Sequence, residues 1–239
     1  MLVELWPDGP LFRNDDGIFR PGMDSVLLAY FANNARPGIN NRAVDLGCGS
    51  GIISVLLAWD APGLQIDGIE IQPKAAKLAI ENSRLCGLTD RIRIIEGDLR
   101  NHRDFLRSGY YDVSVSNPPY YPQGSGKLPS NKEIAAARGE ESCTLSDICM
   151  AAGYLTRWGG SFFLVHKPER LADVFRALSE SCLEPKRLRF VQHNYSSPPS
   201  LVLIESRRGG KPALNVEQPV ILTNDDGSET DEAKAIYRR

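Results

Sequence analysis

The chain has 239 residues, of which 42% are hydrophobic and 24% charged, ordinary values for a globular protein. A formal net charge of −2 and a pI near 6.0 exclude a surface that is positive all over, while leaving room for a local basic face. The five cysteines are widely spaced and odd in number, which is typical of neither a disulfide framework nor a zinc site. Because the first ten residues lack a signal-like apolar run and no stretch is long enough to span a bilayer, we expect a cytoplasmic protein.

The length favours a single domain over residues 1–239. We divide it into an N-terminal hairpin and helix (1–40), a core (41–206) and a C-terminal extension (207–239). Leu11–Phe19 is expected to form the hairpin, with Asp16 and Gly17 at its turn. Asp24 is expected to cap the following helix, which buries apolar residues at helical spacing.

The middle of the chain alternates short apolar runs with helical segments. We expect four strands, at Ala43–Leu46, Leu64–Ile69, Arg91–Ile95 and Tyr111–Ser116. Between them, one helix runs through Ala58 and another from Pro73 to Cys86, where Gly87 is placed to end it. This alternation predicts parallel βαβ units and a doubly wound α/β sheet.

The second half begins with a long polar segment, Tyr121–Glu141, interrupted by proline and glycine. Its length and its place after a strand favour a lid or a substrate-binding loop. We expect the remaining elements to be a helix, a strand, a helix, an antiparallel pair of strands, a hairpin and a short terminal helix: Ser146–Arg157, Gly160–Val165, Pro168–Ser181, Arg187–Val191 with Leu201–Glu205, Val220–Leu222 with the turn Asn224–Gly227, and the helix from Asp231.

The segment Asn117–Tyr120, Asn-Pro-Pro-Tyr, follows the fourth strand directly. Pro118 ends that strand because it has no N–H for the sheet, and it holds Asn117 in extended geometry. The result is a rigid strand end with an amide side chain, free carbonyls and an aromatic ring. Such a cluster can accept both hydrogens of a planar amino group and stack on the ring that bears it.

Acidic residues occur at the ends of the three preceding strands. Asp45 opens the glycine-rich turn Asp45–Gly51, Glu70 ends the second strand, and Asp98 follows the third. The turn has the spacing Gly-x-Gly-x-Gly, and Asp45 would repel a pyrophosphate but tolerate a cation. Glu70 is placed to accept ribose hydroxyls, and Asp98 an adenine amine. Ribose, adenine and a positive centre without phosphate describe S-adenosylmethionine.

On these motifs the chain resembles the class I S-adenosylmethionine-dependent methyltransferases, in the branch that carries Asn-Pro-Pro-Tyr. Further similarity in Phe19–Leu28, His166–Arg170, Glu184–Phe190 and Gly209–Pro212 is to the bacterial adenine-N6-methyltransferases of the valine tRNA anticodon loop. The resemblance implies a Rossmann-like fold with a mostly parallel seven-stranded sheet and a C-terminal antiparallel hairpin. One departure is Gly139, where this family often has histidine.

The resemblance also implies roles for particular residues. Asn117, Pro118 and Tyr120 would be catalytic, with the Asn117 oxygen and the Pro118 carbonyl accepting the two N6 hydrogens of adenine. The implied cofactor-binding residues are Asp24, Asp45, Gly47, Gly49, Gly51, Glu70, Ile71, Asp98, Leu99 and Asn117. This chemistry requires no metal, and His102, His166 and His193 receive no catalytic role.

For RNA we expect a basic face near the C-terminal end and basic residues in the long loop. The candidate RNA-binding residues are Lys127, Arg138, Lys186, Arg187, Arg189, Arg207, Arg208 and Lys211, with Lys132 as a further loop residue. Two alternatives stay open. An enzyme that methylates a glutamine amide in a protein would use the same chemistry, and a non-catalytic RNA-binding protein could keep the fold.

Overall fold

The computed structural model describes residues 2–13, 22–35, 42–120 and 143–238. The predicted turn at Asp16 and Gly17, the loop Tyr121–Glu141 and its residues Lys127, Lys132, Arg138 and Gly139 lie outside these ranges. The strands are β1 (Leu2–Glu4), β2 (Leu11–Arg13), β3 (Arg42–Leu46), β4 (Gln65–Glu70), β5 (Ile92–Glu96), β6 (Tyr111–Ser116), β7 (Thr156–His166), β8 (Leu183–Gln192), β9 (Pro199–Arg208), β10 (Asn215–Val216) and β11 (Val220–Ile221). The helices are α1 (Met23–Ala35), α2 (Ile52–Asp60), α3 (Pro73–Leu85), η1 (Leu99–Asn101), α4 (His102–Phe105), α6 (Leu145–Leu155), η2 (Pro168–Arg170), α7 (Leu171–Glu180) and α8 (Asp231–Tyr237).

A nine-stranded sheet forms the centre of the described part of the chain, in the order β10-β8-β9-β7-β6-β3-β4-β5 with β11 also on β8. Strands β3, β4, β5, β6 and β7 are parallel, and β9 is antiparallel to both β7 and β8. The predicted parallel sheet and the antiparallel pair are therefore confirmed. Strands β10 and β11 add to the expected seven. Strand β11 falls on the predicted Val220–Leu222 but pairs in parallel with β8, whereas β10, with two residues, is too short to leave a periodic signal in the sequence.

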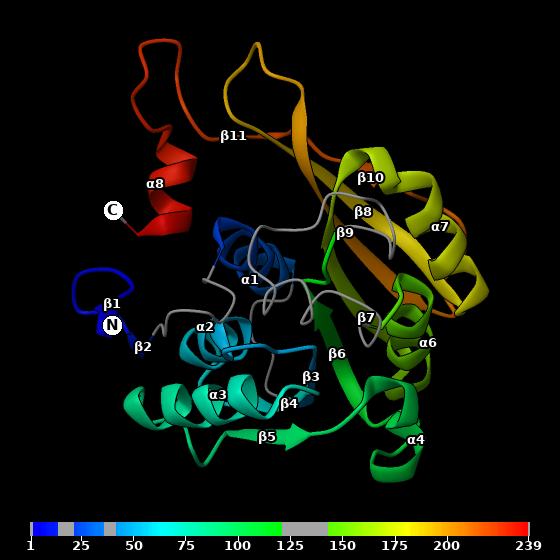
Figure 1. Ribbon diagram of the computed structural model, residues 1–239. Helices are drawn as coiled ribbons and strands as arrows, with labels where there is room; N and C mark the ends of the chain where they lie inside the picture. The colour runs from blue at the N-terminus through cyan, green and yellow to red at the C-terminus, as the bar shows by residue number, and fades with distance from the viewer. Residues whose placement is uncertain (1, 14–21, 36–41, 121–142, 239) are drawn as a thin grey trace, which may run out of the picture.

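Helices cover both faces of the sheet. Figure 1 shows α1, α2 and α3 to one side and α4, α6 and α7 to the other. Neighbouring residues of β7 point to opposite faces, so Phe163 belongs to the buried cluster under α1 and α2, and Phe162 to the one under α6 and α7. Burial on both faces explains why β7 has a continuous apolar run rather than an alternating one.

The structure describes an N-terminal hairpin formed by β1 and β2, whereas the second half of the predicted hairpin Leu11–Phe19 lies outside the described residues. Strand β2 pairs with the preceding β1, with Val3 opposite Phe12, across a turn in which Asp8 has a φ of 59°. The sequence Pro7–Pro10 is a turn signal that could have indicated this pairing. Phe12 is buried against the α1 and α2 side of the core, which holds the hairpin to the domain. Helix α1 begins at Met23, so Asp24 lies in its first turn and does not cap it.

Two boundaries in the second half also differ from expectation. Helix α6 ends at Leu155, two residues early, because β7 begins at Thr156 and lengthens to eleven residues. At the end of the chain, α8 returns to the N-terminal hairpin (Figure 1). The Arg238 guanidinium lies 4.2 Å from the centre of the Trp6 ring in that hairpin. Within the described residues, no helix has the length and apolar character needed to span a membrane.

The glycine at the start of α2 allows two helices to pack closely. Gly51 has a φ of 83°, and a Cβ built on it would lie 3.1 Å from Ala79 Cβ in α3. Gly87, at the end of α3, has a φ of 66° but open space around it. An alanine at either position would adopt a left-handed backbone at a steric cost, and only at Gly51 would its Cβ also press against a neighbouring helix.

We therefore expect Gly87→Ala to lower the free energy of unfolding by about 1–2 kcal/mol, the cost of a left-handed backbone. Gly51→Ala should cost more, because its Cβ would also press against α3. Urea denaturation of both variants measures the difference. Equal losses would mean that the spacing between α2 and α3 adjusts without cost.

Candidate active site

The ends of four neighbouring parallel strands bring the predicted motifs together. The last pair between β3 and β6 is Asp45 with Val115, so Gly47 and Asn117 both lie two residues beyond it. Between β3 and β4 the last pair is Leu46 with Ile69, and Glu70 follows Ile69 directly. Parallel strands end at one edge of a sheet, which is where α/β proteins bind ligands.

The glycine-rich turn is held by backbone and carboxylate hydrogen bonds. The Gly47 and Cys48 N–H groups donate to the Ile69 carbonyl at 3.0 and 2.9 Å. The Gly49 N–H donates to Glu70 Oε2, and the Gln72 N–H to Glu70 Oε1, both at 2.8 Å. Burial raises the pKa of Glu70, while these N–H donors oppose that rise. Each oxygen keeps a second lone pair, so the carboxylate can also accept hydroxyl groups.

Asp45 is fully buried at the mouth of this turn. Its Oδ2 accepts hydrogen bonds from the Ser54 hydroxyl at 2.7 Å and the Ser54 N–H at 3.2 Å. Its Oδ1 is buried and has no hydrogen-bond partner among the described residues. Burial raises the pKa of Asp45 to about 7, Ser54 opposes the rise, and the Glu70 charge adds to it. Asp45 is therefore a carboxyl group that gains from a nearby positive charge.

Space for a ligand lies over the same turn. Gly47 and Gly49 have φ angles of 74° and 56°, and a Cβ built on either would meet no described atom within 4 Å. Behind the turn, the Cys48 Sγ lies 2.9 Å from the place of a Cβ on Gly68, so packing is tight on that side alone. The open front, the unpaired Asp45 oxygen and the Glu70 carboxylate fit a cationic ligand that bears hydroxyl groups.

The Asp98 carboxylate, expected to accept an adenine amine, is already bonded to Arg100. Its carboxylate accepts the Arg100 N–H at 2.9 Å and pairs with the Arg100 guanidinium at 2.6 Å, and these bonds lower its pKa. Ile71 is 40% exposed at the strand edge, whereas Leu99 is buried in the core. The predicted contacts of Asp98, Ile71 and Leu99 with adenine stay predictions.

Asn117 is joined to helix α1 by side-chain hydrogen bonds. Its Nδ2 donates to Ser25 Oγ at 2.9 Å, and its Oδ1 lies 2.9 Å from the Tyr120 hydroxyl. The same hydroxyl donates to Asp24 Oδ2. Ser25 received no role from the sequence, because a serine next to a candidate cap gives no signal of a contact with a residue so distant in the chain.

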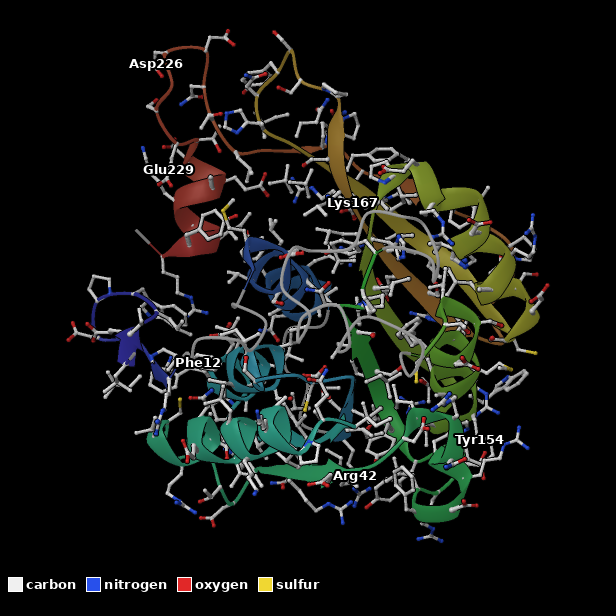
Figure 2. All side chains as sticks on the ribbon, viewed as in Figure 1. Phe12, Arg42, Tyr154, Lys167, Asp226 and Glu229 are labelled. Atoms are coloured by element: carbon white, nitrogen blue, oxygen red, sulfur yellow. The ribbon has the colours of Figure 1, made fainter. Side chains whose placement is uncertain are left out.

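Two more residues missed by the sequence reasoning surround Tyr120. The His166 ring lies edge-on at 5.5 Å, and the Lys167 ammonium lies 5.2 Å from the Tyr120 ring centre. Burial lowers the pKa of His166 to about 4, so its ring is neutral near pH 7. His166 is the last residue of β7 and Lys167 follows it, and β7 pairs with β6. The order of these two strands in the sheet is the signal that could have indicated that both residues lie beside Tyr120. Figure 2 shows Lys167 far from Tyr154, which precedes the other end of β7.

Comparison with known proteins now identifies the family. Residues 12–168 match the methyltransferase small domain family. A tRNA1(Val) (adenine(37)-N6)-methyltransferase of Porphyromonas gingivalis is 31% identical over 79% of this chain and 74% of its own length. The chain belongs to the methyltransferase small domain family. An enzyme of the same name from Dickeya chrysanthemi is 29% identical over 94% of this chain and 88% of its own.

A solved structure supports the fold of this methyltransferase. A predicted O-methyltransferase from Agrobacterium tumefaciens superposes with a TM-score of 0.73 over 90% of this chain and 95% of its own, at 17% identity. At that identity the likeness concerns the fold alone. Within the described residues, no group of three His, Cys, Asp or Glu side chains is arranged to hold a metal ion.

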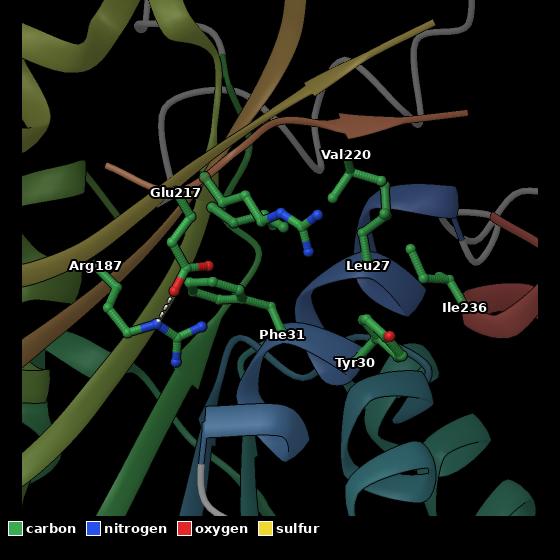
Figure 3. Close-up of a pocket in the computed structure, with 9 residues that line it drawn as sticks. Leu27, Tyr30, Phe31, Arg187, Glu217, Val220 and Ile236 are labelled. Carbon is green, nitrogen blue, oxygen red and sulfur yellow. Dashed lines mark hydrogen bonds and ion pairs between the residues drawn. The ribbon is translucent and has the colours of Figure 1, made fainter. Parts of the chain in front are cut away.

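Two of the expected RNA-binding arginines of this methyltransferase are engaged within the chain. Arg187 pairs with Glu217 at 2.7 Å and Glu205 at 3.0 Å, and it lines a small pocket against Phe31 of α1 (Figure 3). Arg189 makes two hydrogen bonds of 2.7 Å to Glu232 in α8. Both guanidinium groups therefore tie the C-terminal extension to β8 instead of forming a free basic face.

The other basic residues lie away from Tyr120. Opposite β7, Val202 pairs with His166 and Arg207 with Ser161, so about 16 Å of strand separates Arg207 from the active-site edge. Arg208 donates to the Tyr154 and Thr156 carbonyls, and Lys186 to the Lys211 carbonyl. Arg207 and Arg208 therefore lie at the opposite edge of the sheet from Tyr120, because β9 runs antiparallel to β7 and ends there.

We expect Arg189→Ala to lower the free energy of unfolding by about 1–3 kcal/mol, because it leaves the Glu232 carboxylate without its paired donors. Arg207→Ala, at an exposed position, should change it by less than about 0.5 kcal/mol. Chemical denaturation of both variants provides the measurement. Unchanged stability with weakened tRNA binding in Arg189→Ala would restore the RNA-binding role.

Proposed function

We propose that this protein transfers a methyl group from S-adenosylmethionine to the N6 amine of an adenine in tRNA. The observation that carries the proposal is the Asn117 amide at the open strand edge, two residues past the pairing of β6 with β3 and beside the glycine turn. The substrate follows the relatives, which are named for adenine 37 of tRNA1(Val). A single domain working in the cytoplasm belongs to the proposal, supported by five free thiols.

The cofactor would be held by the glycine turn and its acids. Asp45 and the open space over Gly47 and Gly49 suit the positive end, and Glu70 suits the ribose hydroxyls. Ile71 and Asp98 would flank the adenine, with Leu99 and Gly51 supporting them from behind. When bound, the cofactor supplies the methyl group on a sulfonium centre.

The reacting amine would be held by the end of β6. Adenine N6 is a poor nucleophile because its lone pair is delocalised into the ring. Hydrogen bonds from N6 to the Asn117 oxygen and the Pro118 carbonyl would draw the nitrogen toward tetrahedral geometry and orient its lone pair. The Tyr120 ring would stack on the base, a contact worth about 1–3 kcal/mol in related cases. A base in a loop reaches such a pocket at low cost because it leaves few stacking partners.

The RNA would approach the carboxyl edge of the sheet. Lys167 is a basic side chain beside Tyr120 and can reach a phosphate next to the target base. Arg207 and Lys211, exposed at the other end of the sheet, remain candidates for a more distant part of the tRNA. Lys127 and Arg138 of the loop complete the proposed contacts, whereas Arg187, Arg189, Arg208 and Lys186 act within the fold.

The function is tested with labelled S-adenosylmethionine and two transcripts of tRNA1(Val), one natural in sequence and one with adenine 37 replaced by guanine. We expect label as N6-methyladenine in the first transcript and none in the second. Label in both would mean another target nucleotide. Label in a glutamine-containing protein substrate and in neither RNA would favour the amide-methylating alternative.

Asn117→Ala should lower kcat by about 100-fold or more, the typical effect of removing a group that acts on the reacting atoms. Binding of S-adenosylmethionine should change by less than about threefold, because the amide contacts the amine. Asn33→Ala, which removes a surface amide bonded to Asp60, is the matched control. Near-parental turnover in Asn117→Ala would remove Asn117 from catalysis.

Ionisation of Asp45 should make cofactor binding depend on pH. Its pKa is raised to about 7, and a cationic ligand favours the ionised form, so binding releases a proton below that pH. The Kd for S-adenosylmethionine should therefore fall as pH rises from 5.5 to about 7, by up to about tenfold per unit, and then level off. Calorimetry across this range measures it. Asp45→Asn should give weaker binding with a flat profile, and a pH-dependent Asp45→Asn variant would assign the effect to another group.

A further inference from the structure

Three oxygen atoms at the open end of β6 share one proton. The Tyr120 hydroxyl lies 2.9 Å from Asn117 Oδ1 and is also bonded to Asp24 Oδ2. A carboxylate and an amide oxygen only accept, so the single hydroxyl proton is the only one in this cluster. Burial and the Asp24 carboxylate raise the pKa of Tyr120, which keeps that proton on the hydroxyl. Among the described residues, one of the two acceptors therefore lacks a donor at any moment.

The Tyr120 hydroxyl donates its proton preferentially to the Asp24 carboxylate. A hydrogen bond to a charged carboxylate is about twice as strong as one to a neutral amide. The Asn117 oxygen then faces the Tyr120 oxygen with no proton between them. In the structure the Asn117 Nδ2 donates to the hydroxyl of Ser25, which is 3% exposed, and this orientation directs the amide oxygen at Tyr120. The first turn of α1 therefore holds Asn117 with its oxygen toward the site and in need of a donor.

We propose that Asp24 is a positioning residue of the reaction: by accepting the Tyr120 proton, it keeps the Asn117 oxygen open to an N–H donor. The inference rests on the proposed function and gives Asp24 a role other than cofactor binding. It also bears on base selection. An adenine N6 amine brings the missing donor, whereas the O6 of guanine would add a further acceptor to a cluster that already has too many.

The test compares Asp24→Ala, Asp24→Asn and the double variant Asp24→Ala with Tyr120→Phe. In Asp24→Ala the Tyr120 proton turns to Asn117 and occupies its oxygen, so kcat/KM for tRNA should fall by about 10–100-fold. Removing the hydroxyl in the double variant should restore about fivefold or more of that loss. Asp24→Asn keeps an acceptor for Tyr120 and should retain most activity. The Kd for S-adenosylmethionine should stay within about twofold throughout.

The possible outcomes distinguish a failure of the positioning role of Asp24 from a failure of the proposed function. A double variant no faster than Asp24→Ala, with both folded by thermal unfolding, would overturn the role of Asp24. Should Asp24→Ala fail to fold, Asp24→Asn decides: weaker cofactor binding by about tenfold would mean that the Asp24 charge acts on the cofactor. A parent protein inactive on every tRNA tested, but active on another amine or amide, would overturn the proposed function and this inference with it.

Discussion

Parallel pairing of β3 with β4 on one side and β6 on the other is the constraint on which the site depends. It places the glycine turn, Glu70 and Asn117 in one row although they come from three separate parts of the sequence. Side chains alternate along a strand, so a slip of one residue would turn Asp45 from the α2 side to the other face and break its bonds to Ser54. The apolar contacts of Val113 and Phe163 with the cluster around α2 hold this register.

Buried carboxylates give the site its electrostatic character. Asp45 and Glu70 lie at neighbouring strand ends, and burial raises the pKa of both. Loop N–H groups and Ser54 compensate part of the lost hydration, but one Asp45 oxygen has no hydrogen-bond partner in the described part of the chain. A ligand that is positive at one end and hydroxylated at the other satisfies both groups. A phosphate ligand would meet repulsion at the same place.

The C-terminal extension has a structural role, because its glutamates pair with arginines of β8. Arginine in a run of basic residues is normally a solvated surface group, but here Arg187 and Arg189 bind glutamates that follow in the extension and in α8. These contacts close the pocket beside α1 and support the helix that presents Asp24 and Ser25 to Asn117 (Figure 3). The extension therefore contacts the same helix that is hydrogen-bonded to Asn117.

Local sequence patterns determined the strands, most helices and the motifs at the strand ends. Each rests on short-range physics: proline ends β6, glycine permits the turn after β3, and buried strands need apolar runs. Only the tertiary structure decided which side chains meet. Sequence spacing carries no information on whether Arg189 faces Glu232 or RNA, or whether Ser25 reaches Asn117. The position of β9 beside β7 likewise placed Arg207 at the far edge of the sheet. The sequence predicted that β9 pairs with β8, but its second neighbour follows from the packing of the whole sheet.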